Sequence, residues 1–379
     1  MGEVAEFSKG SGYSKSDLTA VGSPIILYGR LYTNYETVID NVDTFTEKKD
    51  NPVISQGDEV IVPSSGETAE DIARASAVSK SGIILGGDLN IIKPNLEINS
   101  AFLAIAISNG NQQKELSKKA QGKSVVHLRN SDLQEIILHL PTLPEQTAIG
   151  TFFRTLDTTI TLHQRKLESL RELKRGYLQK MFPQEGESVP RVRFSGFCGE
   201  WKQKQLGNLF TERSERSGEG ELISVTINSG VIKSSSLERK DNSSEDKSNY
   251  KRVEVGDIAY NSMRMWQGAS GVSDYSGILS PAYTVITPTI GVCSVFFSYM
   301  FKLTKMIQTF QSSSQGLTSD TWNLKFPLLK NISVITPCYE EQQKIALFFR
   351  NLDNQIAAQK DKLNGLKNLK KAYLQKMLV

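Results

Sequence analysis

Two stretches of this sequence carry glycines that could bring the backbone close to a phosphate group. The first ends in Gly122-Lys123-Ser124, but a phosphate-binding loop needs a glycine where Ser117 stands, and a helix where the strand-like run 125–128 follows. The second, residues 8–17, follows no clear βαβ pattern, so we expect a flexible polar loop there. Neither stretch predicts a nucleotide site.

Residues that usually carry catalysis are few. Cys198, Cys293 and Cys338 are too far apart for a CxxC metal site or a disulfide framework, and the chain has only three histidines. It contains no HExxH or GxSxG motif, no Pro-Asp dipeptide that could begin a nuclease carboxylate cluster and no Asp-Pro-Pro-Tyr methyltransferase loop. We therefore expect no catalytic residue and no metal ligand, and the sequence favours a recognition protein over an enzyme.

Length and composition are typical of a globular protein with more than one domain. At 379 residues, with 39% hydrophobic and 23% charged residues, the chain is not disordered and is long for a single core. A run of about 18 apolar residues and a signal-peptide core are both absent from the sequence, so we expect a cytoplasmic protein without a membrane segment. The net charge of +4 does not identify a nucleic-acid binder by itself.

One long segment occurs twice. Residues 145–181 return at 341–377 with a constant offset of 196, and about half of the aligned positions are identical. Mostly apolar residues alternate at spacings of three and four over about four heptads, which predicts a coiled-coil helix of roughly 55 Å in each copy. The apolar seam positions are Phe153, Leu156, Ile160, Leu167, Leu170 and Tyr177 in the first copy, and Phe349, Leu352, Ile356, Leu363, Leu366 and Tyr373 in the second.

An amphipathic rod of this kind needs a partner, and the nearest one is its own duplicate, in a parallel or an antiparallel pair. Polar seam residues fall at matched places, with His163 matching Gln359 and Lys174 matching Lys370. Such residues usually fix the register of a coiled coil. A structural role for His163 is therefore preferred to a catalytic one.

The regions in front of the two helices share one plan although their sequences are unlike. Each has a Gly-Asp pair that opens a short apolar strand, at Gly57 and at Gly256, and then two strands that read as a pair and end at Pro94 and Pro288. Helical segments, a polar loop and a closing strand at 133–141 or 329–337 follow. We expect an α+β fold in which 1–140 and 184–336 are mixed α/β domains and 141–183 and 337–379 are helical spacers.

Two unlike domains, each followed by a near-identical helix that ends in YLQKM, resemble the specificity subunits of type I restriction-modification enzymes. The resemblance covers essentially the whole chain, and the LGNLF stretch at Leu206 is similar to the family's domain opening. It implies two target-recognition domains joined by two long conserved helices, which form an antiparallel coiled coil with a pseudo-two-fold internal repeat.

In that family the subunit is non-catalytic and serves host defence through DNA methylation and restriction. The resemblance implies that each domain reads one half of a bipartite double-stranded DNA target, while the coiled coil sets the spacer and docks two methyltransferase subunits. It also implies two restriction and translocase subunits, with S-adenosylmethionine, ATP and Mg²⁺ on the partner subunits and no cofactor on this chain. The alternative is a coiled-coil adaptor that does not bind DNA, which would leave two divergent domains without a purpose.

The two domains differ at their beginnings. A leader, residues 191–208, precedes the second domain, whereas the first begins at Met1-Gly2, aligned with Leu206-Gly207. The counterpart of the leader is missing. We therefore expect the chain to begin at a recombined or trimmed junction.

Side chains that read bases are mostly Arg, Lys, Asn, Gln, Ser and Thr, and polar loops of both domains offer them. The first domain offers Lys9, Ser11, Tyr13, Lys15, Ser64, Ser65, Gln112, Gln113, Lys114, Lys118, Lys119 and Lys123; the second offers Arg213, Arg216, Asn261, Ser262, Arg264, Gln267, Gln311, Ser312, Ser314 and Gln315. The alternative for Arg264 is a turn cap beside core residues Met263, Met265 and Trp266. The alternative for the lysines is a solvated face.

Overall fold

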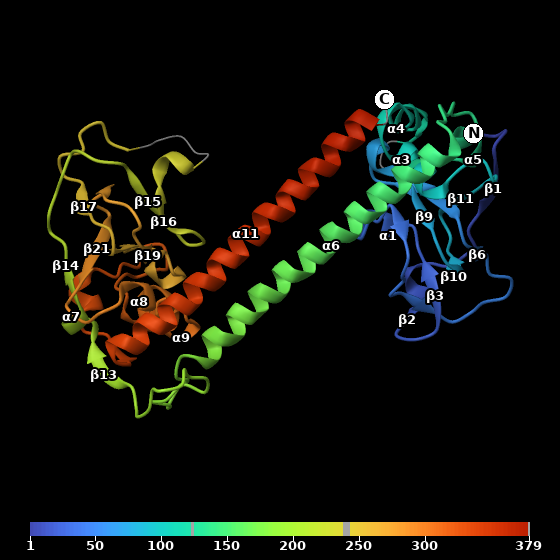
Figure 1. Ribbon diagram of the computed structural model, residues 1–379. Helices are drawn as coiled ribbons and strands as arrows, with labels where there is room; N and C mark the ends of the chain where they lie inside the picture. The colour runs from blue at the N-terminus through green and yellow to red at the C-terminus, as the bar shows by residue number, and fades with distance from the viewer. Residues whose placement is uncertain (123–124, 238–242, 378–379) are drawn as a thin grey trace. The chain divides into compact units, whose positions relative to one another are not determined.

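The computed structural model describes residues 1–122, 125–237 and 243–377 and divides into two compact units. Unit 1 comprises Met1–Lys166 and Gln359–Val379, and unit 2 comprises Leu167–Ala358. Each unit contains one mixed domain and part of both long helices, α6 (Leu143–Lys180) and α11 (Tyr339–Met377) (Figure 1). The predicted α+β class is confirmed. The packing units differ from the four sequence segments because each long helix contributes to both units.

Unit 1 is built on two sheets and one strand pair. The first sheet has the order β1 (Ala5–Lys9), β11 (Leu89–Pro94), β7 (Glu59–Pro63), β9 (Ser76–Val78) and β4 (Val38–Ile39). The second has the order β2 (Leu18–Thr19), β5 (Phe45–Thr46), β3 (Ser23–Ile26), β10 (Ser81–Leu85) and β6 (Ile54–Gln56), and β12 (Val126–His127) pairs with β8 (Ser65–Gly66). Its shorter helical elements are η1 (Lys15–Asp17), α1 (Arg30–Thr33), α2 (Ala69–Ile72), α3 (Ser100–Ser108), α4 (Gly110–Lys119) and α5 (Asn130–Gln134).

Unit 2 repeats this plan with a smaller central sheet. That sheet has the order β14 (Phe210–Glu212), β21 (Tyr283–Pro288), β18 (Ile258–Asn261) and β19 (Ser270–Val272). Three strand pairs join β13 (Lys202–Gln205) to β22 (Ser333–Thr336), β15 (Ile223–Thr226) to β16 (Gly230–Lys233) and β17 (Lys251–Val253) to β20 (Gly277–Leu279). Its shorter helical elements are α7 (Leu206–Leu209), η2 (Ser234–Ser236), η3 (Met265–Gln267), α8 (Ser294–Met300), α9 (Thr304–Ser313) and α10 (Phe326–Leu329).

Buried apolar runs explain the central elements of unit 1. All five residues of β7 are buried, and seven consecutive residues of α3, from Phe102 to Ser108, are buried as well. A strand or helix that is apolar all round is stable only where other elements cover it on every side. Strands β7 and β9 pack against α3 accordingly. These elements hold the end of β7 in a fixed position.

Matching hydrogen bonds establish which residues of the two units are equivalent. The backbone N–H of Leu128 donates to the carbonyl of Ser64 at 3.1 Å, and that of Leu324 donates to the carbonyl of Ser262 at 2.8 Å. Leu128 and Leu324 differ by 196, so the offset of the long helices extends back into both domains. Ser64 is therefore the equivalent of Ser262.

Several local expectations were wrong. The strands that end at Pro94 and Pro288 do not pair with the strands before them, because β10 and β20 belong to other sheets than β11 and β21. No strand forms within 133–141, where α5 ends and residues 136–140 follow without strand pairing, whereas β22 forms in unit 2.

The two Gly-Asp pairs are also not equivalent, as the strand registers demonstrate. Val60 lies opposite Ile92, and Ile258 lies opposite Ile286, so the residues before them correspond. Glu59, 5% exposed, thus takes the place of Asp257, 2% exposed. Asp58 instead lies in the left-handed region, with a φ of 67°.

Within each unit, α6 and α11 run antiparallel. In unit 1 the Nζ of Lys370 lies 2.5 Å from an oxygen of Asp157, and the rings of Phe152 and Tyr373 meet at 5.1 Å. In unit 2 the equivalent contacts are Lys174 with Asp353 at 2.5 Å and Tyr177 with Phe348 at 4.9 Å. The predicted antiparallel pair is confirmed. Among the described residues, no helix is long and apolar enough to cross a membrane.

The seam predicted from the sequence is the contact surface of this helix pair. Its positions are buried or half-buried except Tyr373, which is 38% exposed but keeps its ring contact with Phe152. Gln359 donates from Nε2 to the carbonyl of His163 at 2.8 Å, and the same nitrogen lies 2.6 Å from Nδ1 of His163. His163 and Gln359 are repeat equivalents. At this place, therefore, a seam position of α6 contacts its own equivalent on α11.

Candidate nucleic-acid interface

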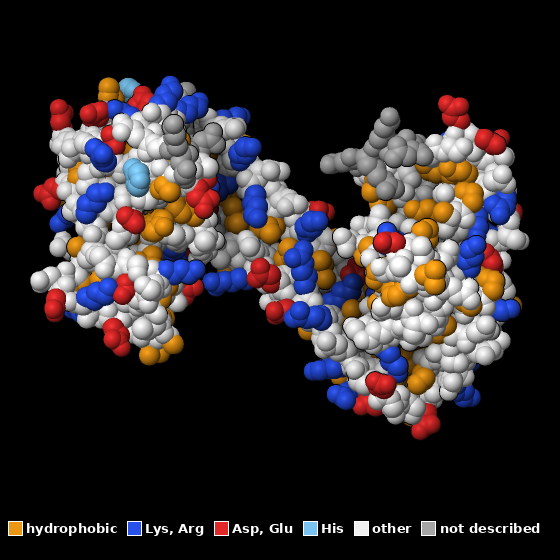
Figure 2. Space-filling view, turned by 180° about the vertical axis from the view of Figure 1, so that it is seen from behind, with side chains coloured by type: hydrophobic (Ala, Val, Ile, Leu, Met, Phe, Trp, Pro, Cys, Tyr) orange, Lys and Arg blue, Asp and Glu red, His pale blue; other side chains and the backbone are white. Residues whose placement is uncertain are grey.

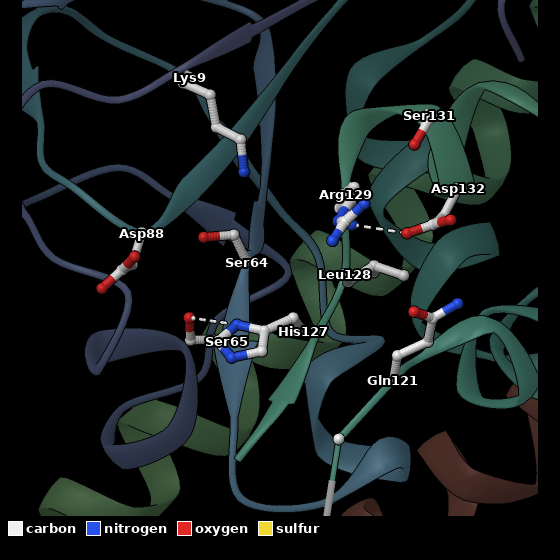
Figure 3. Close-up of a pocket in the computed structure, with 11 residues that line it drawn as sticks. Lys9, Ser64, Ser65, Asp88, Gln121, His127, Leu128, Arg129, Ser131 and Asp132 are labelled. Carbon is white, nitrogen blue, oxygen red and sulfur yellow. Dashed lines mark hydrogen bonds between the residues drawn. The ribbon is translucent and has the colours of Figure 1, made fainter.

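A pocket of about 540 Å³ opens in unit 1 where strands β1 and β7 end. Lys9 closes β1, Ser64 follows β7, and Asp88 precedes β11 (Figure 3). The opposite wall is the segment around β12, which contributes His127 and Arg129. Elements that are far apart in the sequence thus converge on one polar cavity.

The pocket contains charges of both signs. Partial burial of its amine lowers the pKa of Lys9, and the negative charge of Asp88 opposes this change. A carboxylate oxygen of Asp132 accepts a hydrogen bond from the backbone N–H of Arg129 at 2.8 Å. This contact leaves the exposed guanidinium of Arg129 available for an anion such as a DNA phosphate or for a base edge.

Ser65 and His127 are the pair in this pocket that most nearly corresponds to a nucleophile and base. The Ser65 hydroxyl lies 3.3 Å from Nδ1 of His127. Within the described part of the chain, no hydrogen bond is made to the other ring nitrogen, so the pair lacks the third group that orients a catalytic histidine. Its geometry instead suits a hydrogen-bonding surface.

In unit 2, two loops that the sequence analysis treated separately lie together. Helix η3 packs against α9, and the rings of Trp266 and Trp322 meet edge to face at 5.2 Å. Half-buried Arg264 and Gln267 lie on the first loop, and Leu317, 100% exposed, lies on the second. This surface combines polar side chains with an exposed apolar one.

The structural alternative for the 261–267 loop is correct in part, and its DNA contacts stay a prediction. Met265 is fully buried, and the backbone of Arg264 precedes η3, as expected for a turn cap beside the core. Met263 is 42% exposed, so it is not a core residue. The loop therefore has one residue that anchors it and several that face outward.

Three predicted DNA contacts are engaged inside the protein. Ser262 is 3% exposed, and its hydroxyl lies 2.7 Å from that of Thr284. Tyr13 is 5% exposed, and its hydroxyl accepts a hydrogen bond from the backbone N–H of Lys49 at 2.7 Å. The hydroxyl of Ser11 bonds to two backbone groups. The assignments of Ser262 and Tyr13 are corrected to structural roles, and that of half-buried Ser11 stays a prediction.

Arg213 also has a structural role. Its Nε donates to one oxygen of Asp257 at 2.7 Å, and its Nη2 donates to the other at 3.1 Å. This bidentate contact raises the pKa of the Arg213 guanidinium. Arg216 donates to the carbonyl of Asn249 but remains exposed.

The two polar loops expected before the closing strands are largely helical. Gln112, Gln113, Lys114, Lys118 and Lys119 lie in α4, and Gln311 and Ser312 lie in α9. Lys119 pairs with Glu135 at 2.5 Å, and the hydroxyls of Ser312 and Ser314 donate to backbone carbonyls. Lys123 lies outside the described residues. The other candidates, Lys15, Asn261 and Gln315 among them, stay predictions.

Gln121, His127 and Arg129 are among the pocket residues that the sequence analysis missed. The strand-like run 125–128 was recognised, but it was used only to reject a phosphate loop. The signal that could have indicated them is the presence of polar residues in and around the short strand β12. Its pairing with β8 brings them to Ser65.

Surface charge does not by itself locate the interface. On the face drawn in Figure 2, Lys and Arg side chains are interspersed with Asp and Glu and gather into no single large patch. Within the described ranges, no group of three or more His, Cys, Asp or Glu side chains could hold a metal ion.

Removing the two pocket cations should weaken DNA binding. We expect Lys9→Ala with Arg129→Ala to lower the affinity of the assembled complex for its target by about tenfold or more and to reduce the steepness of its salt dependence. Lys48→Ala with Lys80→Ala, at exposed sites outside the pocket, is the control. Binding measured by fluorescence anisotropy at several salt concentrations tests this, and equal salt slopes for both double variants would contradict it.

The comparisons with known proteins agree with the architecture. The family model described as type I restriction modification DNA specificity domain matches residues 1–172 and 199–368. The chain therefore belongs to this family. It is a DNA-recognition component of a type I restriction-modification system.

One solved structure supports the fold, and a second is more distantly similar. The S subunit of a type I restriction-modification system from M. genitalium is 18% identical, with 99% of this chain and 93% of that chain covered and a TM-score of 0.63. The HsdS subunit from Thermoanaerobacter tengcongensis is 16% identical over 87% of this chain and 84% of its own, with a TM-score of 0.45. At 18% identity, the likeness to the M. genitalium subunit concerns the fold alone.

Proposed function

We propose that each unit of this chain reads one half of a bipartite double-stranded DNA target, and that α6 and α11 set the spacing between the halves. The observation that supports this most directly is the contrast between the repeats. The long helices make equivalent contacts in both units, while the polar surfaces differ. A repeated scaffold with two different surfaces suits two readers of unlike sequences.

The helix pair also fits the docking of two copies of a methyltransferase subunit. Leu173 on α6 and Leu369 on α11 are repeat equivalents, and they are 46% and 44% exposed. Exposed leucines at matched places offer the same apolar contact twice, as two copies of one partner need. Two restriction and translocase subunits complete the proposed assembly.

In this proposal the chain contributes recognition and no catalysis of its own. S-adenosylmethionine would be held by the methyltransferase subunits, and ATP and Mg²⁺ by those subunits that move and cleave DNA. The side chains of this chain would hydrogen-bond base edges and phosphates and so position the target adenines for the partner.

Modified-base sequencing tests the proposal. DNA from cells that express this chain with a cognate methyltransferase subunit should carry N6-methyladenine in a motif of two short specific parts separated by a fixed spacer. A stable complex that adds no methylation would contradict the proposal and favour the adaptor alternative. A motif with only one specific part would contradict the assignment of one reader to each unit.

A further inference from the structure

Residues 137–140 of unit 1 lack the strand partner that their equivalents in unit 2 have. In unit 2, β13 pairs with β22, from Lys202 opposite Thr336 to Gln205 opposite Ser333. The 196-residue offset equates β22 with residues 137–140, which pair with no strand among the described residues. Leu140 is 37% exposed, whereas its equivalent Thr336 is 1% exposed. A backbone segment without a partner of this kind can pair with an added strand, as β22 pairs with β13.

Backbone hydrogen bonds beside this edge secure the equivalence. The N–H of Gly207 donates to the carbonyl of Lys330 at 2.8 Å, and that of Gly2 donates to the carbonyl of Gln134 at 3.0 Å. Lys330 and Gln134 differ by 196. The predicted alignment of Met1-Gly2 with Leu206-Gly207 is thus confirmed.

A carboxylate at the start of each long helix is covered by the leader in unit 2 and exposed in unit 1. Glu341 is fully buried, and its two oxygens accept hydrogen bonds from Nε and Nη2 of Arg193 in the leader, each at 2.7 Å. Its equivalent, Glu145, is exposed and accepts no hydrogen bond from the residues that the structure describes. Unit 1 therefore has the acceptor of this ion pair, and none of its described residues supplies the donor.

The repeats also differ in how far the leader covers an aromatic ring of the long helix. The ring of Phe194 in the leader lies 6.0 Å from that of Phe348, which is half-buried. Phe152, the equivalent of Phe348, is 38% exposed. Away from the leader the repeats agree, since Leu143 and its equivalent Tyr339 are 42% and 39% exposed. The greater exposure in unit 1 therefore follows the path that the leader takes in unit 2.

We propose that residues 137–140, Glu145 and Phe152 form an acceptor site for a leader segment, which adds a strand to the edge and pairs an arginine with Glu145. The occupant is a polypeptide with the chemistry of residues 191–205: an arginine and an aromatic residue, followed eight residues later by a polar strand. Strand addition supplies main-chain hydrogen bonds, and the ion pair supplies selectivity.

A labelled synthetic peptide of residues 191–205 tests the site with the full chain. Exposed Cys198 is replaced by Ser in the peptide to prevent oxidation. We expect saturable binding by fluorescence anisotropy, weakened about tenfold by Glu145→Arg in the chain, because the arginine of the peptide would then face a second cation. A peptide with Arg193→Glu should bind the Glu145→Arg chain better than the original peptide does.

Two controls keep the test decisive. Glu47→Arg changes the same charge at an exposed residue outside the site and should leave binding unchanged. His139→Pro, which removes a backbone N–H from the edge, should weaken binding while circular dichroism reports an unchanged fold. No saturable binding, or equal loss with Glu47→Arg, would overturn the proposal. Self-association of the chain that the peptide does not reduce would assign the surface to a second copy instead.

The methylation experiment distinguishes this inference from the proposed function. A bipartite methylated motif together with no peptide binding would reject the acceptor site alone. Peptide binding without methylation would reject the reading function alone.

Discussion

Asp257→Ala is expected to lower the free energy of unfolding of unit 2 by about 3–5 kcal/mol, because it breaks a buried ion pair and leaves the partner charge uncompensated. The side chain of Asp257 is 2% exposed, and that of Arg213 is 20% exposed. The carboxylate also accepts hydrogen bonds from the backbone N–H of Glu254 at 2.8 Å and from the hydroxyl of Thr287 at 2.9 Å. One substitution therefore leaves several donors unpaired.

Urea unfolding followed by tryptophan fluorescence measures this loss selectively. All three tryptophans, Trp201, Trp266 and Trp322, lie in unit 2. Glu215→Ala is the matched control, because Glu215 also contacts Arg213, at 3.1 Å, but its side chain is 49% exposed. We expect the control to cost less than about 1 kcal/mol. Equal losses for the two variants would mean that burial of Asp257 contributes nothing special to stability.

Phe349→Ala should cost about 3–5 kcal/mol of unfolding free energy, as large-to-small changes of buried aromatic residues do. Phe349 is fully buried in unit 2 and meets the rings of Phe182, Tyr299 and Phe348 at 6.2, 5.1 and 5.3 Å. Truncation would leave a cavity within an aromatic cluster that has little room to collapse.

The repeat provides the matched variant. Phe153 is the equivalent of Phe349 and is also fully buried, but Phe152 is its one aromatic contact among the described residues. Phe153→Ala should therefore cost less, and its loss should appear in hydrogen exchange of unit 1 and not in the tryptophan signal. A large tryptophan shift from Phe153→Ala would contradict this, and would mean that the two units unfold as one.

The long helices were predictable because their information is local and repeated. A three-four spacing over four heptads specifies both the helix and the face it buries, and the matched residues His163 and Gln359 indicated the register. The family resemblance was carried by the same segments. The antiparallel direction did not follow from spacing alone, and it required the contacts of Lys174 and Lys370.

The polar candidates were less predictable, since residue type does not tell which way a side chain points. Ser64 and Ser262 occupy equivalent places, yet Ser64 lines a pocket and Ser262 bonds to Thr284 in the interior. Arg213 has the composition of a DNA contact, but a carboxylate 44 residues later in the chain engages it. The pairing of β12 with β8, which builds the pocket wall, depends on residues about 60 positions apart.

The ion pairs of the helix seam constrain how this chain can change in length. Asp157 and Lys174 are 17 residues apart on α6, and their partners Lys370 and Asp353 are 17 residues apart on α11. An insertion between these residues in one helix alone would make the two intervals unequal. At least one of the two ion pairs would then be lost. Insertions of about seven residues in both helices would keep the intervals equal and the same faces in contact. Natural or engineered variants with altered spacing should therefore carry compensating changes in both repeats.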